Sequence, residues 1–313
     1  MSDAVLDQIR EIIQRDVNNR GLARDPHENL FTICRDDFAN ACRSIAETPQ
    51  PVLFIVTGFF IPHAQPPCGE TDGPLGAIFL ARAWQPLGIN VALVTDDYCR
   101  RALEIGLQAC GLFDSVPVNP LPDSRISVVL RPWPWQPFSR PHLLALERVG
   151  PGRDGRCRNM HGRDVTEEMA SVDWLFEYAS RLTPRLTTIG IGDGGNEIGM
   201  GKMPPDMIAR NIPNGERIAC RVPTDHLIVA GVSNWGAYAL AAGVAVLRRQ
   251  PLPATLFDVE RERELLRVMV EKGSLVDGVT GRQTVTVDGL AFDDYIEPLR
   301  RIGELLKREQ CLN

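Results

Sequence analysis

The residues best suited to chemistry stand together in one glycine-rich stretch, Thr187 to Met203 (TTIGIGDGGNEIGMGKM). Asp193, Asn196 and Glu197 lie there among five glycines that fall between positions 190 and 199. Two carboxylates and an amide on a glycine turn suit a cation, either a divalent metal ion such as Mg²⁺ or Mn²⁺ or the ammonium group of a substrate. We therefore predict that Asp193 and Glu197 are catalytic or metal-binding residues that share a cation. The substrate is expected to contact the rest of the turn, Gly194, Gly195 and Asn196.

The same turn satisfies the pattern G-x-G-x-x-G at Gly190, Gly192 and Gly195, which also occurs in dinucleotide-binding proteins. The aspartate within the turn would repel a pyrophosphate, and the helix expected to open at Gly195 is short because a proline pair at 204–205 ends it. A nucleotide- or phosphate-binding enzyme is therefore an alternative, not the leading interpretation. A purely structural turn, whose Asp and Asn side chains cap a helix, also stays open.

The elements that must position this turn alternate between strands and helices. Apolar runs typical of central parallel strands occur at Pro51–Phe59, Ile89–Thr95, Leu186–Ile191 and Leu227–Val232, with a weaker candidate at Arg125–Leu130. Helical periodicity or capping signals occur at 3–19, Asp36–Glu47, Pro74–Ala83, Asp164–Arg181, Ala237–Leu247, Glu260–Glu271 and Asp293–Lys307. We predict an α/β, Rossmann-like three-layer domain with a mainly parallel central sheet, which carries its site at the carboxyl ends of the strands.

Further candidates follow the predicted strands. Thr57 and Gly58 lie at the end of the first strand, and the proline-rich loop after it holds Glu70 and Asp72. Asp72 has a simpler interpretation as the cap of the helix that begins at Pro74, whereas Glu70 has no capping role and is a candidate catalytic residue. We expect one cleft to be lined by these residues, by the turn 193–197 and by two residues after the last strand, Ser233 and Asn234.

The charged segment from Glu147 to Thr166 has no clear periodicity and is punctuated by glycine, as functional loops often are. His161 can exchange protons near neutral pH, although an exposed loop histidine is the alternative. Arg148 and Arg163 are candidates for gripping a carboxylate with two parallel hydrogen bonds, and Asn159 is a candidate substrate contact.

Two other segments flank the predicted site. Residues 1–48 form a helical extension that packs either on the core or on a second subunit, so a homo-oligomer is left open, and residues 49–313 form the α/β domain. The segment Gly273–Leu290 is turn-rich and alternates around Thr284–Val287, which predicts a hairpin or flap near the site.

Composition limits the partners and the compartment. The chain has 313 residues, 44% of them hydrophobic, and a net charge of -6, which argues against a nucleic-acid partner. It has no apolar run long enough for a membrane span, and its N-terminus resembles neither a secretory signal nor a transit peptide. The eight cysteines contain no C-x-x-C pair, so we expect no zinc cluster and a cytoplasmic protein with reduced thiols.

Five motifs in order together resemble the C-terminal domain of the D-glutamate cyclase family. They are GETDGP (Gly69–Pro74), ERVGP (Glu147–Pro151), DGRCRNMHGRDVT (Asp154–Thr166), GIGDGGNEIGMGKM (Gly190–Met203) and VSNWGAYAL (Val232–Leu240). The resemblance covers roughly residues 50 to 290 without large gaps, as expected of one doubly wound domain. It implies a carbon–oxygen lyase (a hydro-lyase) that converts D-glutamate to 5-oxo-D-proline with loss of water.

This reaction needs a base for the amine, an acid for the departing oxygen and a cation for the carboxylate. The candidate bases are Asp193 and Glu197, and the candidate acids are Glu70 and His161. In animals the enzyme of this family joins the domain to a second, N-terminal domain, for which 313 residues leave no room. The alternative is therefore a non-catalytic module that binds an acidic amino acid and needs a partner domain for turnover.

Overall fold

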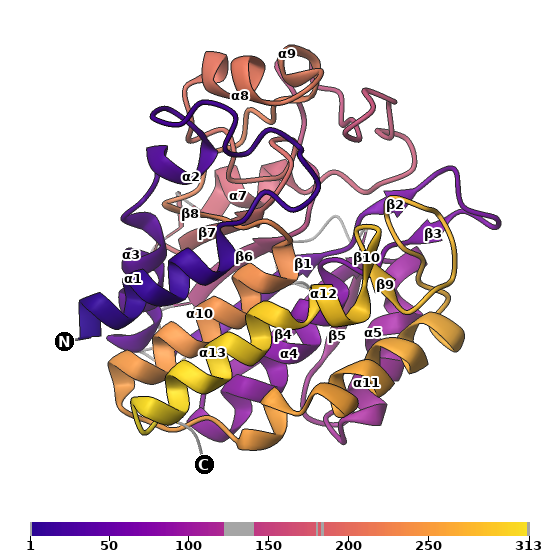
Figure 1. Cartoon of the computed structure of the whole chain (residues 1–313). Coiled ribbons are helices and arrows are strands. Elements are labelled where there is room, and N and C mark those ends of the chain that lie inside the picture. The colour runs from indigo at the N-terminus through magenta and orange to yellow at the C-terminus, as the bar shows by residue number, and fades with distance from the viewer. Residues whose placement is uncertain (1, 122–140, 180, 183–184, 312–313) are drawn as a thin grey trace.

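The computed structural model describes residues 2–121, 141–179, 181–182 and 185–311 (Figure 1). The strand predicted at Arg125–Leu130 lies outside these residues. Within them the chain forms three layers, with a six-stranded sheet between two sets of helices. The predicted α/β fold class is confirmed.

All paired strands of the central sheet run parallel, in the order β5-β4-β1-β6-β7-β8. Their bounds are β1 Val52–Thr57, β4 Asn90–Asp96, β5 Val118–Leu121, β6 Pro141–Leu146, β7 Thr187–Gly192 and β8 His226–Val229. The chain leaves β1 first toward β4 and β5 and later returns to β6 on its other side. Because the strand order reverses between β1 and β6, the carboxyl ends of these two strands mark the place where such folds bind ligands.

The first strand shows why the apolar runs become strands. Every residue of β1 is buried, and successive side chains point to opposite faces of the sheet. Leu53 and Ile55 pack in one hydrophobic cluster, whereas Phe54 and Val56 pack in the other. The four main predicted strands are all present, and the sequence analysis missed β5 and the central strand β6.

The two faces are covered unequally. The first cluster is formed with long helices, α1 Ser2–Ile13, α3 Asp37–Ala46, α4 Pro74–Trp84, α5 Asp97–Ala109, α10 Ser233–Arg248, α11 Val259–Glu271 and α13 Glu297–Arg308, together with the short α12 Phe292–Tyr295. The opposite cluster is formed with short ones, α2 Leu30–Ile33, α7 Asp173–Ala179, α8 Pro205–Asn211 and α9 Gly215–Ile218. Short segments complete the described fold: η1 Gln85–Leu87, η2 Ala254–Phe257, and two small hairpins, β2 Phe60–Ile61 with β3 Cys68–Gly69 and β9 Thr286–Val287 with β10 Leu290–Ala291.

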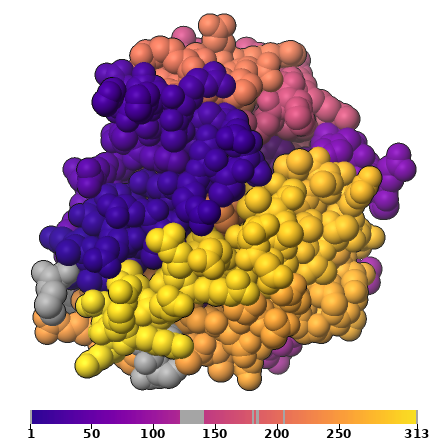
Figure 2. Space-filling view, viewed as in Figure 1, coloured from indigo at the N-terminus to yellow at the C-terminus, as the bar shows by residue number. Residues whose placement is uncertain are grey.

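The N-terminal helices pack on the core of this chain. Helices α1 and α3 both contact α10, and their apolar side chains belong to the first hydrophobic cluster. Helix α1 also contacts α13, and the N-terminal and C-terminal segments adjoin on the face shown in Figure 2. The two ends of the chain can therefore contribute to one site.

Two predicted helices are wrong. No helix opens at Gly195: Gly195 and Gly199 have φ angles of 97° and 111°, outside the helical region, and the next helix begins at Pro205. The helix predicted over Asp164–Arg181 is confined to α7, Asp173–Ala179. Ahead of it, the backbone N–H of Ala170 donates to a carboxylate, that of Asp96, at 2.7 Å, so a side chain replaces a helical acceptor.

Candidate active site

A cavity of about 320 Å³ lies at the carboxyl ends of the strands, beside the point where the strand order reverses. Its lining comes from the segments that follow β1, β6 and β7, from the N-terminal segment and from the β9–β10 hairpin. The described residues that line it are Asn18, Arg20, Phe59, Ile61, His63, Glu70, Glu147, Asn159, Met160, His161, Asp193, Asn196, Glu197, Gly278, Val279 and Asp288.

The glycine turn is organised by the carboxylate of Glu197. One oxygen of Glu197 accepts the backbone N–H groups of Asp193 at 2.9 Å and Gly194 at 2.6 Å, and the other accepts that of Gly195 at 2.8 Å. The ring of N–H donors that would bind a phosphate is therefore already occupied by a carboxylate of the same turn. This geometry disfavours the nucleotide alternative, and it makes Glu197 a residue that shapes the turn.

Glu147 follows β6 directly and lines the cavity. Its φ of 46° is unusual for a residue with a side chain, and its carboxylate accepts a hydrogen bond from the hydroxyl of Ser233 at 2.5 Å. Burial, followed by the charges of Asp193 and Glu197, raises the pKa of Glu147 well above its usual value. A buried carboxyl group of this kind at a ligand-binding edge holds a proton more readily than a free glutamate does, and it is a candidate for proton transfer.

Asp72 and Asn234 hold two helices together beneath the cavity. The carboxylate of Asp72 accepts the backbone N–H groups of Ser233 at 2.9 Å and Asn234 at 2.8 Å, at the start of α10. In return, the side-chain oxygen of Asn234 accepts the N–H groups of Gly73 at 2.9 Å and Gly76 at 2.7 Å, at the start of α4. Each side chain thus caps the helix of the other segment, whereas Asp72 was expected to cap the helix that follows it.

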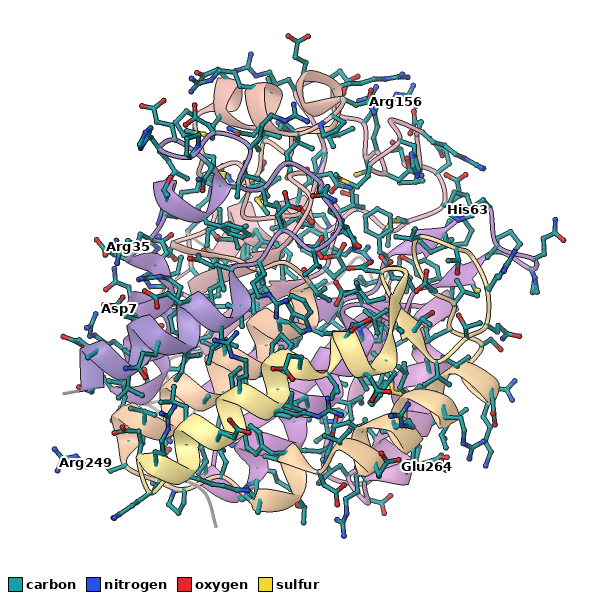
Figure 3. The ribbon with its side chains drawn as sticks, viewed as in Figure 1. Asp7, Arg35, His63, Arg156, Arg249 and Glu264 are labelled. Carbon is teal, nitrogen blue, oxygen red and sulfur yellow. The ribbon has the colours of Figure 1, made fainter. Side chains whose placement is uncertain are left out.

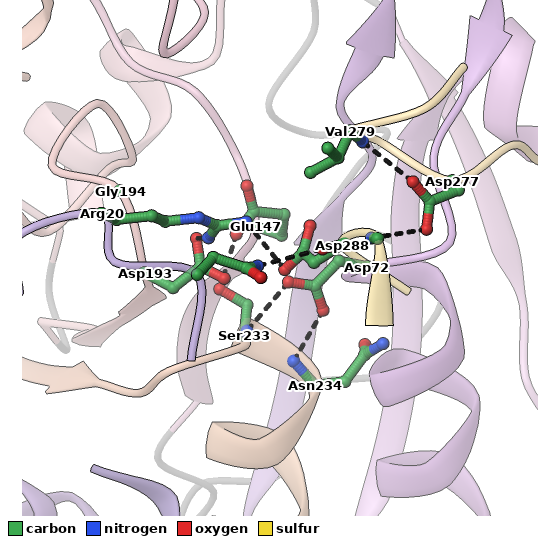
Figure 4. A network of polar contacts seen from close by, with 12 residues as sticks. Arg20, Asp72, Glu147, Asp193, Gly194, Ser233, Asn234, Asp277, Val279 and Asp288 are labelled. Atoms are coloured by element: carbon green, nitrogen blue, oxygen red, sulfur yellow. Dashed lines mark hydrogen bonds and ion pairs between the residues drawn. The ribbon is translucent and has the colours of Figure 1, made fainter. Parts of the chain in front are cut away.

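Arg20 enters the site from the N-terminal segment (Figure 4). Its guanidinium forms ion pairs with Asp193 and, at 3.0 Å, with Asp288 in the turn between β9 and β10. Burial raises the pKa of Asp288 to about 7, although the charge of Arg20 lowers it. The hairpin predicted within Gly273–Leu290 is therefore present beside the cavity, and it supplies a carboxyl group.

Glu70 approaches the cavity from the segment that follows β3. A side chain at Gly278 would place its first carbon 1.7 Å from a carboxylate oxygen of Glu70, so only glycine leaves room there. Burial, followed by the charges of Asp288 and Asp72, raises the pKa of Glu70 well above its usual value. Burial raises the pKa of Asp193 as well, although the charge of Arg20 lowers it.

Carboxyl groups outnumber cations in this region. Asp72, Asp193 and Asp288 have oxygen atoms within 4.8 Å of one another, and so do Glu147, Asp193 and Glu197. One oxygen of Asp193 is buried with no hydrogen-bond partner among the described residues. Because unpaired carboxylates repel one another, the cluster suits a cationic ligand group, or protons shared among its members.

Several predicted site residues lie elsewhere. The guanidinium of Arg148 is buried on the carboxylate of Asp96 and does not line the cavity, and Arg163 is exposed outside it, so neither grips a ligand there. Thr57 and Gly58 are buried but are not among the lining residues. Asn159 and His161 do line the cavity, and the side chain of Asn159 accepts the backbone N–H of His161 at 3.1 Å.

The sequence analysis missed Arg20, Glu147 and Asp288 as site residues. Glu147 stands in one of the motifs that carry the resemblance, but the strand before it was not recognised. Arg20 and Asp288 lie far apart in the chain, and the side-chain amide of Asn18 donates to the backbone oxygen of Asp288 at 3.0 Å. Only the folded chain brings these two segments together.

The sequence is similar to known proteins along most of its length. A model of the family "D-glutamate cyclase-like, C-terminal" matches residues 9–303, which include the segment that carries Arg20. The human protein "D-glutamate cyclase, mitochondrial" is 29% identical over 327 aligned positions, which cover 95% of this chain and 51% of that protein. The chain thus spans about half the length of this relative. Its name places the relative in mitochondria, and the cytoplasmic location expected for this chain stays a prediction.

Among the described residues, no helix has both the length and the hydrophobicity that crossing a membrane requires.

Proposed function

Because the chain belongs to the D-glutamate cyclase-like, C-terminal family, we propose that it catalyses the cyclisation of D-glutamate to 5-oxo-D-proline with loss of water. The observation that carries this proposal is the cavity in which Glu70, Glu147 and Asp193, all buried and with raised pKa values, surround one arginine. Such a site suits a small substrate that carries both an ammonium group and carboxylates.

The reaction moves two protons from nitrogen to oxygen. The ammonium group must lose one proton to become a nucleophile and a second as the lactam forms. The carbon–nitrogen bond forms at the side-chain carboxyl carbon, and the carbon–oxygen bond breaks after the departing oxygen has gained two protons, so that it leaves as water. A free carboxylate resists attack by an amine, and hence its protonation is the central requirement.

Carboxyl groups with raised pKa values meet this requirement because they hold a proton at higher pH than a free carboxyl group does. In our proposal Glu147, whose orientation is held by Ser233, takes protons from the amine. Glu70 supplies protons to the departing oxygen, and His161 at the cavity exchanges protons with solvent. Asp193 attracts the substrate's ammonium group, and Glu197 keeps the N–H groups of the turn satisfied.

A divalent metal ion is the alternative to proton transfer by Glu147. In that version the oxygens of Glu147, Asp193 and Glu197 would hold Mg²⁺ or Mn²⁺, which prefer oxygen ligands, and Glu147 would not act as the base. The ion would neutralise the carboxylate of the substrate and stabilise the developing oxyanion.

A second candidate rests on the match to 51% of the human relative, whose activity belongs to that whole protein. In it, this domain binds an acidic amino acid but needs a partner domain for turnover. The two candidates differ in one observable: the cyclase forms product, whereas the binding module shows saturable binding alone.

The deciding experiment incubates the purified chain with D-glutamate or L-glutamate, with Mg²⁺, with Mn²⁺ or with a chelator, and follows 5-oxoproline by chiral chromatography. Heat-denatured protein controls for spontaneous cyclisation. We expect Glu147→Gln to lower kcat by about 10²- to 10⁴-fold, the range for a general acid–base group. The matched control is Glu264→Gln on α11, which Figure 3 shows well apart from His63 of the cavity. Calorimetric binding of D-glutamate without product would favour the binding module.

A further inference from the structure

We infer that Arg20 binds the α-carboxylate of the substrate and is the specificity-determining residue of the site, an assignment that rests on the proposed cyclase function. It names the substrate class as amino acids with a free α-carboxylate. Arg148 and Arg163, the arginines suggested by the sequence motifs, lie outside the cavity, whereas Arg20 lines it.

The charges in the cavity support this assignment. Among the described residues that line it, Arg20 is the only arginine or lysine, whereas five are Asp or Glu: Glu70, Glu147, Asp193, Glu197 and Asp288. A dicarboxylate substrate that entered a cavity with only carboxyl groups would be repelled. The guanidinium is the one permanently charged group in this lining that can attract it, and its planar fork matches a carboxylate.

Arg20 is held in place by a well-ordered turn. The carboxylate of Asp16 accepts the backbone N–H of Arg20 at 2.8 Å and that of Gly21 at 2.9 Å. Gly21 has a φ of 100°, and a side chain there would come within 2.0 Å of the backbone oxygen of Asn211. The turn therefore rests directly on the last residue of α8, and this contact fixes the point from which Arg20 reaches the cavity.

The two partners of Arg20 occupy different nitrogens of the guanidinium. Asp288 pairs with one terminal nitrogen at 3.0 Å, which is the longer of the two ion pairs. A substrate carboxylate that replaces Asp288 on this nitrogen exchanges one carboxylate partner for another and keeps the charge of the guanidinium paired. Asp193 keeps its ion pair with the other terminal nitrogen, so the guanidinium stays oriented.

The chemistry decides which of the two substrate carboxylates Arg20 takes. The side-chain carboxyl must become neutral before the amine attacks it, and arginine stays protonated and cannot supply the proton. Glu70 and Glu147 line the cavity as buried carboxyl groups, and a protonated carboxyl group, unlike arginine, can give up its proton. The reacting carboxyl group therefore belongs beside the glutamates, and the α-carboxylate, which does not react, belongs on Arg20.

The test compares two substrates in one assay. D-Isoglutamine has the same amine and side-chain carboxyl group as D-glutamate but carries an uncharged amide in place of the α-carboxylate. We expect the wild-type protein to prefer D-glutamate in kcat/KM, and Arg20→Met to reduce this preference by about 100-fold, as expected when a charged hydrogen-bonded pair is lost. Arg20→Lys, which keeps the charge but not the fork, should retain part of the preference.

Arg24→Met, at an exposed arginine four residues further along the same segment, is the matched control and should keep the wild-type preference. Denaturation curves show whether each variant is folded. If all variants turn over both substrates with the wild-type ratio, the assignment of Arg20 is wrong while the cyclase function stands. If neither the wild type nor any variant forms product, the preference for D-glutamate over D-isoglutamine is taken from the ratio of their calorimetric dissociation constants. Selectivity that is lost in Arg20→Met then supports the assignment, and unchanged selectivity or no binding by the wild type overturns it.

Discussion

Two arginines near the carboxyl edge of the sheet show how differently one fold can use the same side chain. Arg148 is fully buried, with its guanidinium on Asp96, on the backbone oxygen of Gly58 at 3.1 Å and on that of Ala170 at 2.5 Å. Asp96 in turn accepts the N–H of Ala170 at 2.7 Å. One positive charge thus meets one negative charge and a set of backbone groups, so the charges balance without a ligand, although the Nε of Arg148 has no hydrogen-bond partner among the described residues.

The region around Arg20 is not balanced in this way. Its guanidinium contacts two carboxylates, Asp193 and Asp288, and the cavity that it lines holds further carboxyl groups. The pKa of Asp288 is raised to about 7 by burial, and that of Glu147 is raised by burial and by its acidic neighbours. A buried arginine with matched partners thus connects strands, whereas one with an excess of carboxyl groups marks a place where protons and a ligand complete the charge.

The largest expected effect tests whether Arg148 is structural. Arg148→Met leaves Asp96 buried without its cation, so we expect the free energy of unfolding to fall by about 3–5 kcal/mol in denaturant titrations. Arg20→Met should cost less at pH 6, because Asp288 can take up a proton in place of the lost ion pair. Removing the exposed pair of Arg100 and Glu104 by Arg100→Ala is the control, and we expect it to leave the free energy of unfolding unchanged within error. Equal losses for the two buried arginines would contradict the comparison.

An effect of intermediate size is expected at Glu197, which lines the cavity. Its carboxylate accepts three backbone N–H groups, and Asp96 likewise accepts one backbone N–H group. Glu197→Gln offers one side-chain oxygen instead of two, so a buried N–H of the turn loses its acceptor. We expect a loss of about 1–3 kcal/mol in the free energy of unfolding, together with reduced turnover. An unchanged stability with abolished turnover would show instead that Glu197 acts on the substrate directly.

The smallest expected effect, measured for each pH unit, is a pH dependence from Asp288. Its folded pKa of about 7 lies above the unfolded value of 3.8, so the folded state holds a proton that the unfolded state has lost between these values. The stability contributed by this proton is fully present below pH 3.8, declines as pH rises, and is lost above about pH 7, at up to about 1.4 kcal/mol per pH unit. Asp288→Asn has no such proton. Its stability relative to wild type should therefore rise from pH 4 to 7 and then level off, and a constant difference would contradict the raised pKa.

The fold could be predicted from the sequence where local patterns were strong. Strands β1 and β7 are buried because helices cover both faces of the sheet. Such strands have few polar residues, so they can be recognised from the sequence alone. The helix expected at Gly195 failed because the backbone there pairs across the chain: the N–H of Ile198 donates to the oxygen of Arg148 at 2.8 Å. Long-range pairing of this kind overrides the local signal of a glycine turn.

The site residues show the same difference between local sequence signals and long-range contacts. The sequence by itself determined that Glu70, Asp193 and Glu197 belong to a glycine-rich, acidic cavity, because residue types and motif positions are local properties. Only the tertiary structure decided which arginine faces that cavity, because charge balance depends on distances in space. Arg20, from the N-terminal segment, meets Asp288, from a hairpin near the C-terminus, and local sequence patterns do not report a contact between segments so far apart.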